Sequence, residues 1–121
     1  MERRIYPRVK TCNLISYLAM RENGQIVDQG MGRALNISQN GILLETPRLL
    51  FSEYISLMSV DVNNHLIEIK GKVVYSGIHG LEMIRNGICM QGQHHENIKF
   101  AAELIKVFHN RKNRVAAAAM I

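Results

Sequence analysis

Strand-like apolar runs follow one another along most of the chain before residue 92, and one of them alternates with a period of two, which is typical of strands with one buried face. The clearest run is LIEIKGKVVYS, in which Glu68, Lys70 and Lys72 separate apolar neighbours. This pattern predicts antiparallel strands at 9–20, 25–38, 42–45, 54–62 and 66–76, with a last hairpin or bulged strand at 80–91.

Asn-containing pairs favour the tight turns between such strands, because Asn and Gly readily adopt positive φ angles. Gly30 and Gly32, inside a strand-like run, predict a bulge or a sharply coiled strand. The expected turns are Asn23-Gly24, Asn40-Gly41, Asn63-Asn64 and Asn86-Gly87.

Beyond residue 92 the apolar period becomes helical. One face carries Ile98, Ala101, Ala102, Ile105 and Phe108, and the RKNR stretch at 111–114 is expected to end the helix, where cations complement its dipole. Short strands followed by one helix predict a mainly β fold, a small antiparallel barrel closed by a C-terminal α-helix.

The length of 121 residues, 47% of them hydrophobic, suits one domain with one core. We expect a flexible, charged arm at 1–8, the barrel with its helix at 9–114, and a short apolar tail at 115–121. No apolar segment has the length of a signal peptide core or a membrane span, so the expected location is cytoplasmic.

The net charge of +5 favours an anionic partner such as a nucleic acid, a nucleotide, an acidic protein or an anionic membrane surface, without choosing among them. Cys12 and Cys89 have neither zinc nor redox spacing, and the five histidines form no ligand pattern, so we expect reduced thiols and no metal. No nucleophile elbow or acid-base pair is present, so enzyme activity is not expected.

Two short motifs carry candidate binding chemistry. In RIYPR, at 4–8, Arg4 and Arg8 offer planar forks that suit phosphate oxygens and the O6/N7 edge of guanine. In NISQNG, at 36–41, Asn36 and Ser38 share one face of an extended chain, and Gly41 permits close approach. The simpler interpretations are a solvated arm and an ordinary turn in which Ser38 bonds nearby backbone.

Together, R-x-x-x-R and [D/N]-x-S-x-x-G, in this order ahead of and within a small barrel, resemble the motifs of the PilZ domain family. The resemblance covers nearly the whole chain and implies a six-stranded PilZ-like barrel that is a bacterial receptor for the second messenger cyclic di-GMP. One departure is GICM at 87–90, where the family more often has an aromatic residue after the Gly-Ile pair; Met90 can fill that space.

By position, the resemblance implies that Arg4 and Arg8 hold the phosphates and guanine edges of cyclic di-GMP. Asn36 and Ser38 would hydrogen-bond a guanine, and Gly41 would shape the turn. Arg3 is similar to an extra arginine in members that bind an intercalated dimer of the ligand.

The implied role is that of an effector. Ordering of the arm by the ligand would alter contact with an unknown downstream protein controlling motility, biofilm, polysaccharide or virulence. The alternative is a basic barrel that binds single-stranded nucleic acid, although only 6% of the residues are aromatic and no aromatic-basic strand pattern is present. A third interpretation is an adaptor that has kept the fold and lost the ligand.

Overall fold

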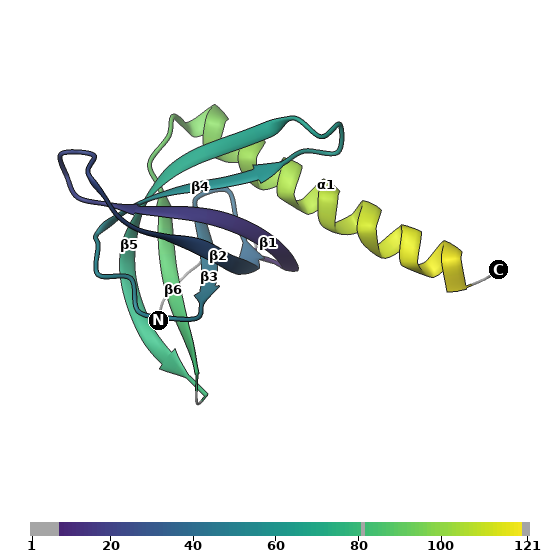
Figure 1. Ribbon diagram of the computed structural model, residues 1–121. Coiled ribbons are helices and arrows are strands. Elements are labelled where there is room, and N and C mark those ends of the chain that lie inside the picture. Colours follow the sequence, from purple (N-terminus) through teal and green to yellow (C-terminus); the bar gives the residue numbers. More distant parts are fainter. Residues whose placement is uncertain (1–7, 81, 120–121) are drawn as a thin grey trace, which may run out of the picture.

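The described residues of the computed structural model, 8–80 and 82–119, form six strands and one helix, with side chains described as far as residue 111 (Figure 1). The strands close into an antiparallel barrel in the order β1-β2-β3-β6-β5-β4, which confirms the predicted fold class. Their bounds are β1 Val9–Met20, β2 Ile26–Ile37, β3 Gly41–Thr46, β4 Tyr54–Val60, β5 Leu66–His79, β6 Met83–Met90 and α1 His94–Ala119.

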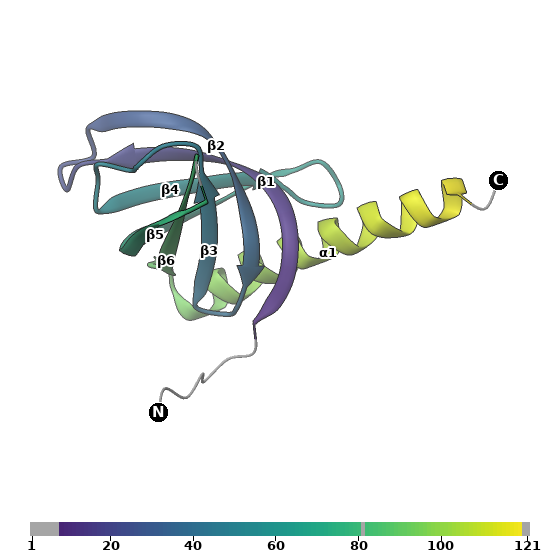
Figure 2. The same ribbon diagram turned by 90° about the horizontal axis from the view of Figure 1, so that it is seen from below.

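The core follows from the period of two. Ile15, Tyr17 and Ala19 alternate along β1 and are all at most 1% exposed, as the inward face of a barrel strand requires. Helix α1 covers one end of the barrel with its apolar face, on which Phe100 and Leu104 are buried (Figures 1 and 2). Burying a side chain such as Leu104 contributes roughly 1.5–3 kcal/mol to stability.

Two polar contacts fix the position of α1. The carboxylate of Glu96 accepts a hydrogen bond from the backbone N–H of Gln93 at 2.9 Å, so one of the unpaired donors at the start of the helix is satisfied. Further along, Asn13 in β1 donates through Nδ2 to the carbonyl oxygen of Leu104 at 3.0 Å. The helix is therefore joined to the barrel wall by a buried hydrogen bond as well as by apolar packing.

The helix is longer than expected. It continues to Ala119, so the RKNR stretch at 111–114 lies within it and not at its end. The alanines that follow RKNR explain the difference, because alanine is the strongest helix former.

The predicted bulge at Gly30 and Gly32 is absent, since the β1–β2 register runs without a break from Asn13↔Ala34 to Ala19↔Asp28. The glycines serve close packing instead. A Cβ on Gly30 would lie 2.7 Å from the Tyr17 hydroxyl oxygen, and the strands here are strongly curved (Figure 2). The alternative prediction, a sharply coiled strand, describes this region.

The turn predicted at Asn86-Gly87 is wrong. Strand β6 runs straight through both residues, and the β5–β6 turn contains Gly80 with a φ of 72°. Asn86 is fully buried, and its side-chain polar atoms are hydrogen-bonded there. Its amide nitrogen donates to the Leu44 carbonyl oxygen and to Thr46 Oγ1, both at 3.0 Å, and its Oδ1 accepts from Ser76 at 2.7 Å. These bonds hold strands β3, β5 and β6 together from inside.

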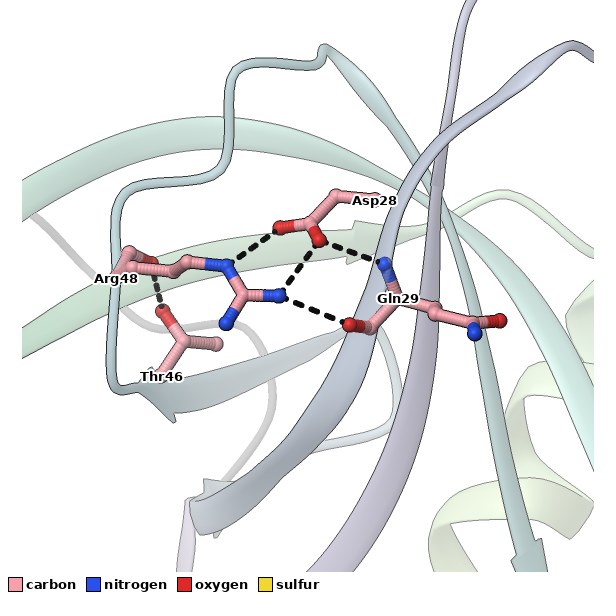
Figure 3. A network of polar contacts seen from close by, with 4 residues as sticks. All are labelled: Asp28, Gln29, Thr46 and Arg48. Carbon is pink, nitrogen blue, oxygen red and sulfur yellow. Dashed lines mark hydrogen bonds and ion pairs between the residues drawn. The ribbon is translucent and has the colours of Figure 1, made fainter.

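An exposed ion pair secures the loop between β3 and β4 (Figure 3). Arg48 donates to both carboxylate oxygens of Asp28, at 3.0 and 2.6 Å, and to the carbonyl oxygen of Gln29 at 3.0 Å. The side-chain hydrogen bond from Arg48 is the main reason that the pKa of Asp28 is lowered. Because such surface pairs contribute little energy, the contact orients the loop more than it stabilises the barrel.

Candidate functional site

A groove of about 240 Å³ lies on the outer wall of the barrel, beside the β2–β3 turn. It crosses the outer faces of β2, β3, β6 and β5. We call it the barrel groove, and its walls are formed by Arg8, Asn36, Ser38, Asn40, Gly41, Ile42, Leu43, Val74, Tyr75, Gly87, Ile88 and Cys89.

Four of the six predicted site residues line this groove: Arg8, Asn36, Ser38 and Gly41. Arg8 precedes β1, whereas the other three belong to the end of β2, the following turn and the start of β3, so the fold brings together segments far apart in sequence. Arg3 and Arg4 lie outside the described residues.

The side chain of Ser38 organises the β2–β3 turn. Its Oγ accepts from the backbone N–H of Gly41 at 3.1 Å and of Asn40 at 3.4 Å, and its hydroxyl reaches the Gly41 carbonyl oxygen at 3.4 Å. Ser38 therefore bonds its own turn, as the simpler interpretation of NISQNG predicts, and it also lines the groove.

Gly41 does not have the positive φ expected of an Asn-Gly turn; among the described glycines, Gly24 and Gly80 do. Its role is steric. A Cβ there would lie 3.2 Å from the Ile88 carbonyl oxygen on β6, which is tighter than ordinary van der Waals contact. The missing side chain lets β3 and β6 approach closely and leaves backbone at the groove surface.

The alternation expected for Asn36 and Ser38 is observed. Ile37 between them is fully buried in the core, while its two neighbours are half-buried and line the groove. An amide and a hydroxyl therefore lie on the same outer face, two residues apart, with a core residue between them.

Tyr75 is the residue that the sequence reasoning missed. Its ring lies over Gly87 so closely that a Cβ on that glycine would be 2.1 Å from Tyr75 Cε1. The side chain is nevertheless 54% exposed. The groove thus has an aromatic ring that packs on Gly87 of β6 and leaves about half of its surface to solvent.

Strand register aligns these groups. Asn36 pairs with Leu43, Leu43 with Gly87, and Gly87 with Tyr75, so one row crosses four strands. With neighbouring strands about 4.8 Å apart, this row is about 14 Å long. A hydrogen-bonding amide stands at one end and an aromatic ring at the other, separated by an apolar centre.

Two ion pairs lie in strand register on either side of this row, outside the residues that line the groove. On one side Lys72 pairs in register with Cys89, and its Nζ lies 3.2 Å from a Glu53 carboxylate oxygen, whose hydrogen bond is the first cause of its raised pKa. On the other side Arg85 Nε lies 3.6 Å from a Glu45 carboxylate oxygen. Of the described residues that line the groove, only Arg8 carries a formal charge, so the groove has one cation at its edge and an uncharged floor.

Metal chemistry finds no support among the described residues, since no three His, Cys, Asp or Glu side chains gather as a metal site would require. Cys12 and Cys89 are both free. In the part of the chain that the structure describes, no helix has the length and apolar character of a membrane span.

Neither a family model nor a curated protein matches the sequence. The fold matches MrkH of K. pneumonia, at TM-score 0.62 and 19% identity in its complex with c-di-GMP, and at TM-score 0.60 and 16% identity in its apo state. These matches cover 94% of this chain but 56% and 55% of the MrkH chains, so the chain spans about half of that protein.

A looser likeness, at TM-score 0.49 and 15% identity over 98% of each chain, is to the PilZ domain of YcgR from Escherichia coli with c-di-GMP. The order of strands, the closed barrel and the C-terminal helix give this chain a PilZ-like fold, as the two motifs predicted. At these identities the likeness is one of fold.

Proposed function

We propose that this chain is a receptor for cyclic di-GMP and not an enzyme. The observation that carries the proposal is that Arg8, Asn36, Ser38 and Gly41 line one groove. These residues come from two separate sequence motifs, and the resemblance of both motifs to the PilZ family implies the same ligand. The likeness of fold to MrkH, which has been determined with c-di-GMP, supports the same conclusion.

In this proposal the charged and the polar residues have different roles. Arg8 and Arg4 bind phosphate oxygens and guanine edges through charge-assisted hydrogen bonds. Asn36 offers its amide to a guanine edge. Ser38 keeps the turn in shape through its accepting lone pairs. Its Oγ lies 3.4 Å from the Gly41 carbonyl oxygen, a long hydrogen bond, so the hydroxyl is easily redirected to a ligand.

Tyr75 supplies the stacking surface for a guanine base in the same groove. Base-aromatic stacking contributes about 1–3 kcal/mol per base. Leu43 and Val74, which also line the groove, give the flat ring system apolar neighbours.

The Gly87→Ala variant tests the Tyr75 contact. The added Cβ must displace the ring, so cyclic di-GMP should bind about 5- to 150-fold more weakly, the equivalent of one lost stacking contact. Gly77→Ala is the matched control, because Gly77 lies two residues beyond Tyr75 in β5, opposite Arg85, with open space around it, and this variant should bind like the wild type. Calorimetric titration of the two variants measures the effect, and equal affinity would exclude stacking on Tyr75.

The proposed receptor is a bacterial, cytoplasmic effector whose arm, residues 1–8, becomes ordered on the ligand. The ordered arm then changes contact with a downstream protein of a motility, biofilm, polysaccharide or virulence system. Residues 1–7 lie outside the described part of the chain, so the ordering of the arm stays a prediction.

Calorimetric titration of the whole chain with cyclic di-GMP, cyclic di-AMP and a single-stranded oligonucleotide tests the function. We expect binding of cyclic di-GMP in clear preference, because adenine lacks the O6 acceptor of guanine. Two molecules per chain are expected if Arg3 holds a second ligand, with a decrease toward one in Arg3→Leu.

Equal affinity for the two cyclic dinucleotides would remove the guanine-reading roles of four residues: Arg4, Arg8, Asn36 and Ser38. Preferential binding of the oligonucleotide would instead favour a nucleic-acid-binding barrel. A wild-type stoichiometry of one would exclude only the second ligand molecule and the role of Arg3.

A further inference from the structure

The second half of β5 has a free edge. Strand β4 pairs with β5 only up to Lys72, whereas β6 follows β5 to His79, in a hairpin that projects past the ends of the other strands (Figure 1). The last backbone hydrogen bond on the β4 side runs from the Val73 N–H to the Glu53 carbonyl oxygen, at 2.8 Å. Beyond it, no described residue hydrogen-bonds the backbone of residues 74–79 from that side. We call residues 74–79 the β5 edge.

The side chains of the β5 edge do not protect it. Proteins usually block an exposed strand edge with charged residues, proline or a bulge. The sequence here, VYSGIH, has no proline and no formal charge at pH 7 with histidine neutral, and Val74, Tyr75 and Ile78 are 59%, 54% and 83% exposed. A register shift stands at Val74, but from Tyr75 to His79 the pairing with β6 is regular. The edge therefore offers a regular, uncharged row of backbone groups.

A comparable edge in β2 is blocked. Strand β3 pairs with β2 only from Arg33 onward, so residues 26–32 also have no described strand on that side. There, Arg48 donates to the carbonyl oxygen of Gln29, and Asp28 accepts from the Gln29 N–H at 2.8 Å (Figure 3). Two charged side chains thus occupy both backbone groups of Gln29. The contrast shows that the fold protects one edge and leaves the other open.

We propose that the β5 edge is a docking site for an extended segment of another protein, which adds to the barrel wall as a further strand. A row of unpaired N–H and C=O groups at strand spacing is matched by another extended backbone, and by neither a nucleic acid nor a lipid surface. Tyr75 and Ile78, three residues apart, lie on opposite faces of the strand. They favour apolar side chains on the segment.

The size of the edge favours such a segment over a second copy of this chain. The regular part, residues 75–79, is about 17 Å long, whereas a stable interface between two folded chains buries roughly 800 Å² on each partner. Two rigid barrels that meet at one short edge bury much less. A flexible segment can follow the edge and also reach the exposed side chains on both of its faces.

The docking site lies beside the candidate ligand site, because Val74 and Tyr75 also line the barrel groove. In the receptor proposed above, the added strand belongs to the downstream protein, and a base stacked on Tyr75 lies next to it. This assignment of the segment rests on the proposed function, whereas the free edge does not.

Hydrogen exchange of the whole chain, measured without cyclic di-GMP, tests the docking site. The probe is a short synthetic peptide of alternating valine and threonine with a glutamate at each end. In excess, it should slow exchange of backbone amides in residues 74–79 at least about tenfold. The same peptide, N-methylated at two successive central residues, loses a donor on each of its edges and should give no such protection.

The Ile78→Lys variant places a charge on the β5 edge, as naturally protected edges do, and should weaken peptide binding at least about tenfold. Leu66→Lys is the matched control. Leu66 is 70% exposed on the same strand, but it pairs with Val60 of β4, so this variant should bind the peptide like the wild type. Thermal unfolding checks that both variants fold.

Absence of protection with the peptide in excess, equal protection by the two peptides, or equal losses in Ile78→Lys and Leu66→Lys would each overturn the proposal. A dimer in sedimentation that dissociates in Ile78→Lys would overturn it too, by assigning the edge to a second copy. A chain that binds the peptide at this edge but does not bind cyclic di-GMP would support the docking site and contradict the proposed function.

Discussion

Replacement of Arg8 by alanine is expected to weaken cyclic di-GMP binding by roughly 2–5 kcal/mol, or about 30- to 4000-fold, as when one partner of a desolvated charge pair is lost. Arg8 lines the barrel groove but precedes β1 and is exposed. Its loss should therefore leave the melting temperature of the free protein almost unchanged. Calorimetric titration and thermal unfolding measure the two quantities, and Arg4→Ala is expected to behave in the same way.

Arg21→Ala is the matched control for Arg8→Ala. It removes the same charge from an exposed position in the turn at the other end of β1. If both variants lose affinity equally, the effect of Arg8 is one of overall charge. If Arg8→Ala binds like the wild type, Arg8 has no place in the binding site.

The Asn86→Leu variant is expected to lose about 2–4 kcal/mol of stability, because two hydrogen bonds to buried partners and one from Ser76 disappear together. Chemical denaturation measures the free energy of unfolding. Ser76→Ala removes only one of these bonds, at an exposed position, and should cost about 1 kcal/mol or less.

Equal stability of Asn86→Leu and the wild type would mean that apolar packing replaces the buried amide without loss. A large loss in Ser76→Ala would instead move the centre of the network from Asn86 to the strand surface.

The sequence pattern was sufficient for most of the fold, because strand alternation and helical period are local properties. The three Asn-Gly pairs mark the limit of that approach. Gly24 turns the chain with a φ of 89°, Gly41 lies at a turn without positive φ, and Gly87 is in the middle of a strand. What distinguishes them is what a side chain at each position would meet: open space at Gly24, the Ile88 carbonyl oxygen at Gly41 and the Tyr75 ring at Gly87.

The same limit applies to the candidate site. The motif residues were found because their types and spacing were visible in RIYPR and NISQNG. Tyr75 was not found, because nothing in KVVYS indicates that the residue paired with it in β6 is a glycine. Only the register Tyr75↔Gly87 places an aromatic ring in the row that begins at Asn36.

Helix α1 has 26 residues, and Leu104 is the last fully buried side chain among those described. Val107, Asn110 and Arg111 lie beside the β4–β5 turn, and the helix then extends away from the barrel (Figure 1). From Ile105 to Ala119 the axis is about 21 Å long at 1.5 Å per residue. A rotation of the helix about its buried part near Leu104 would therefore move its far end much further than the residues beside the barrel. A tilt of about 10° there would displace the far end by about 4 Å, so a small repacking near Ala102 becomes a movement large enough for another protein to detect.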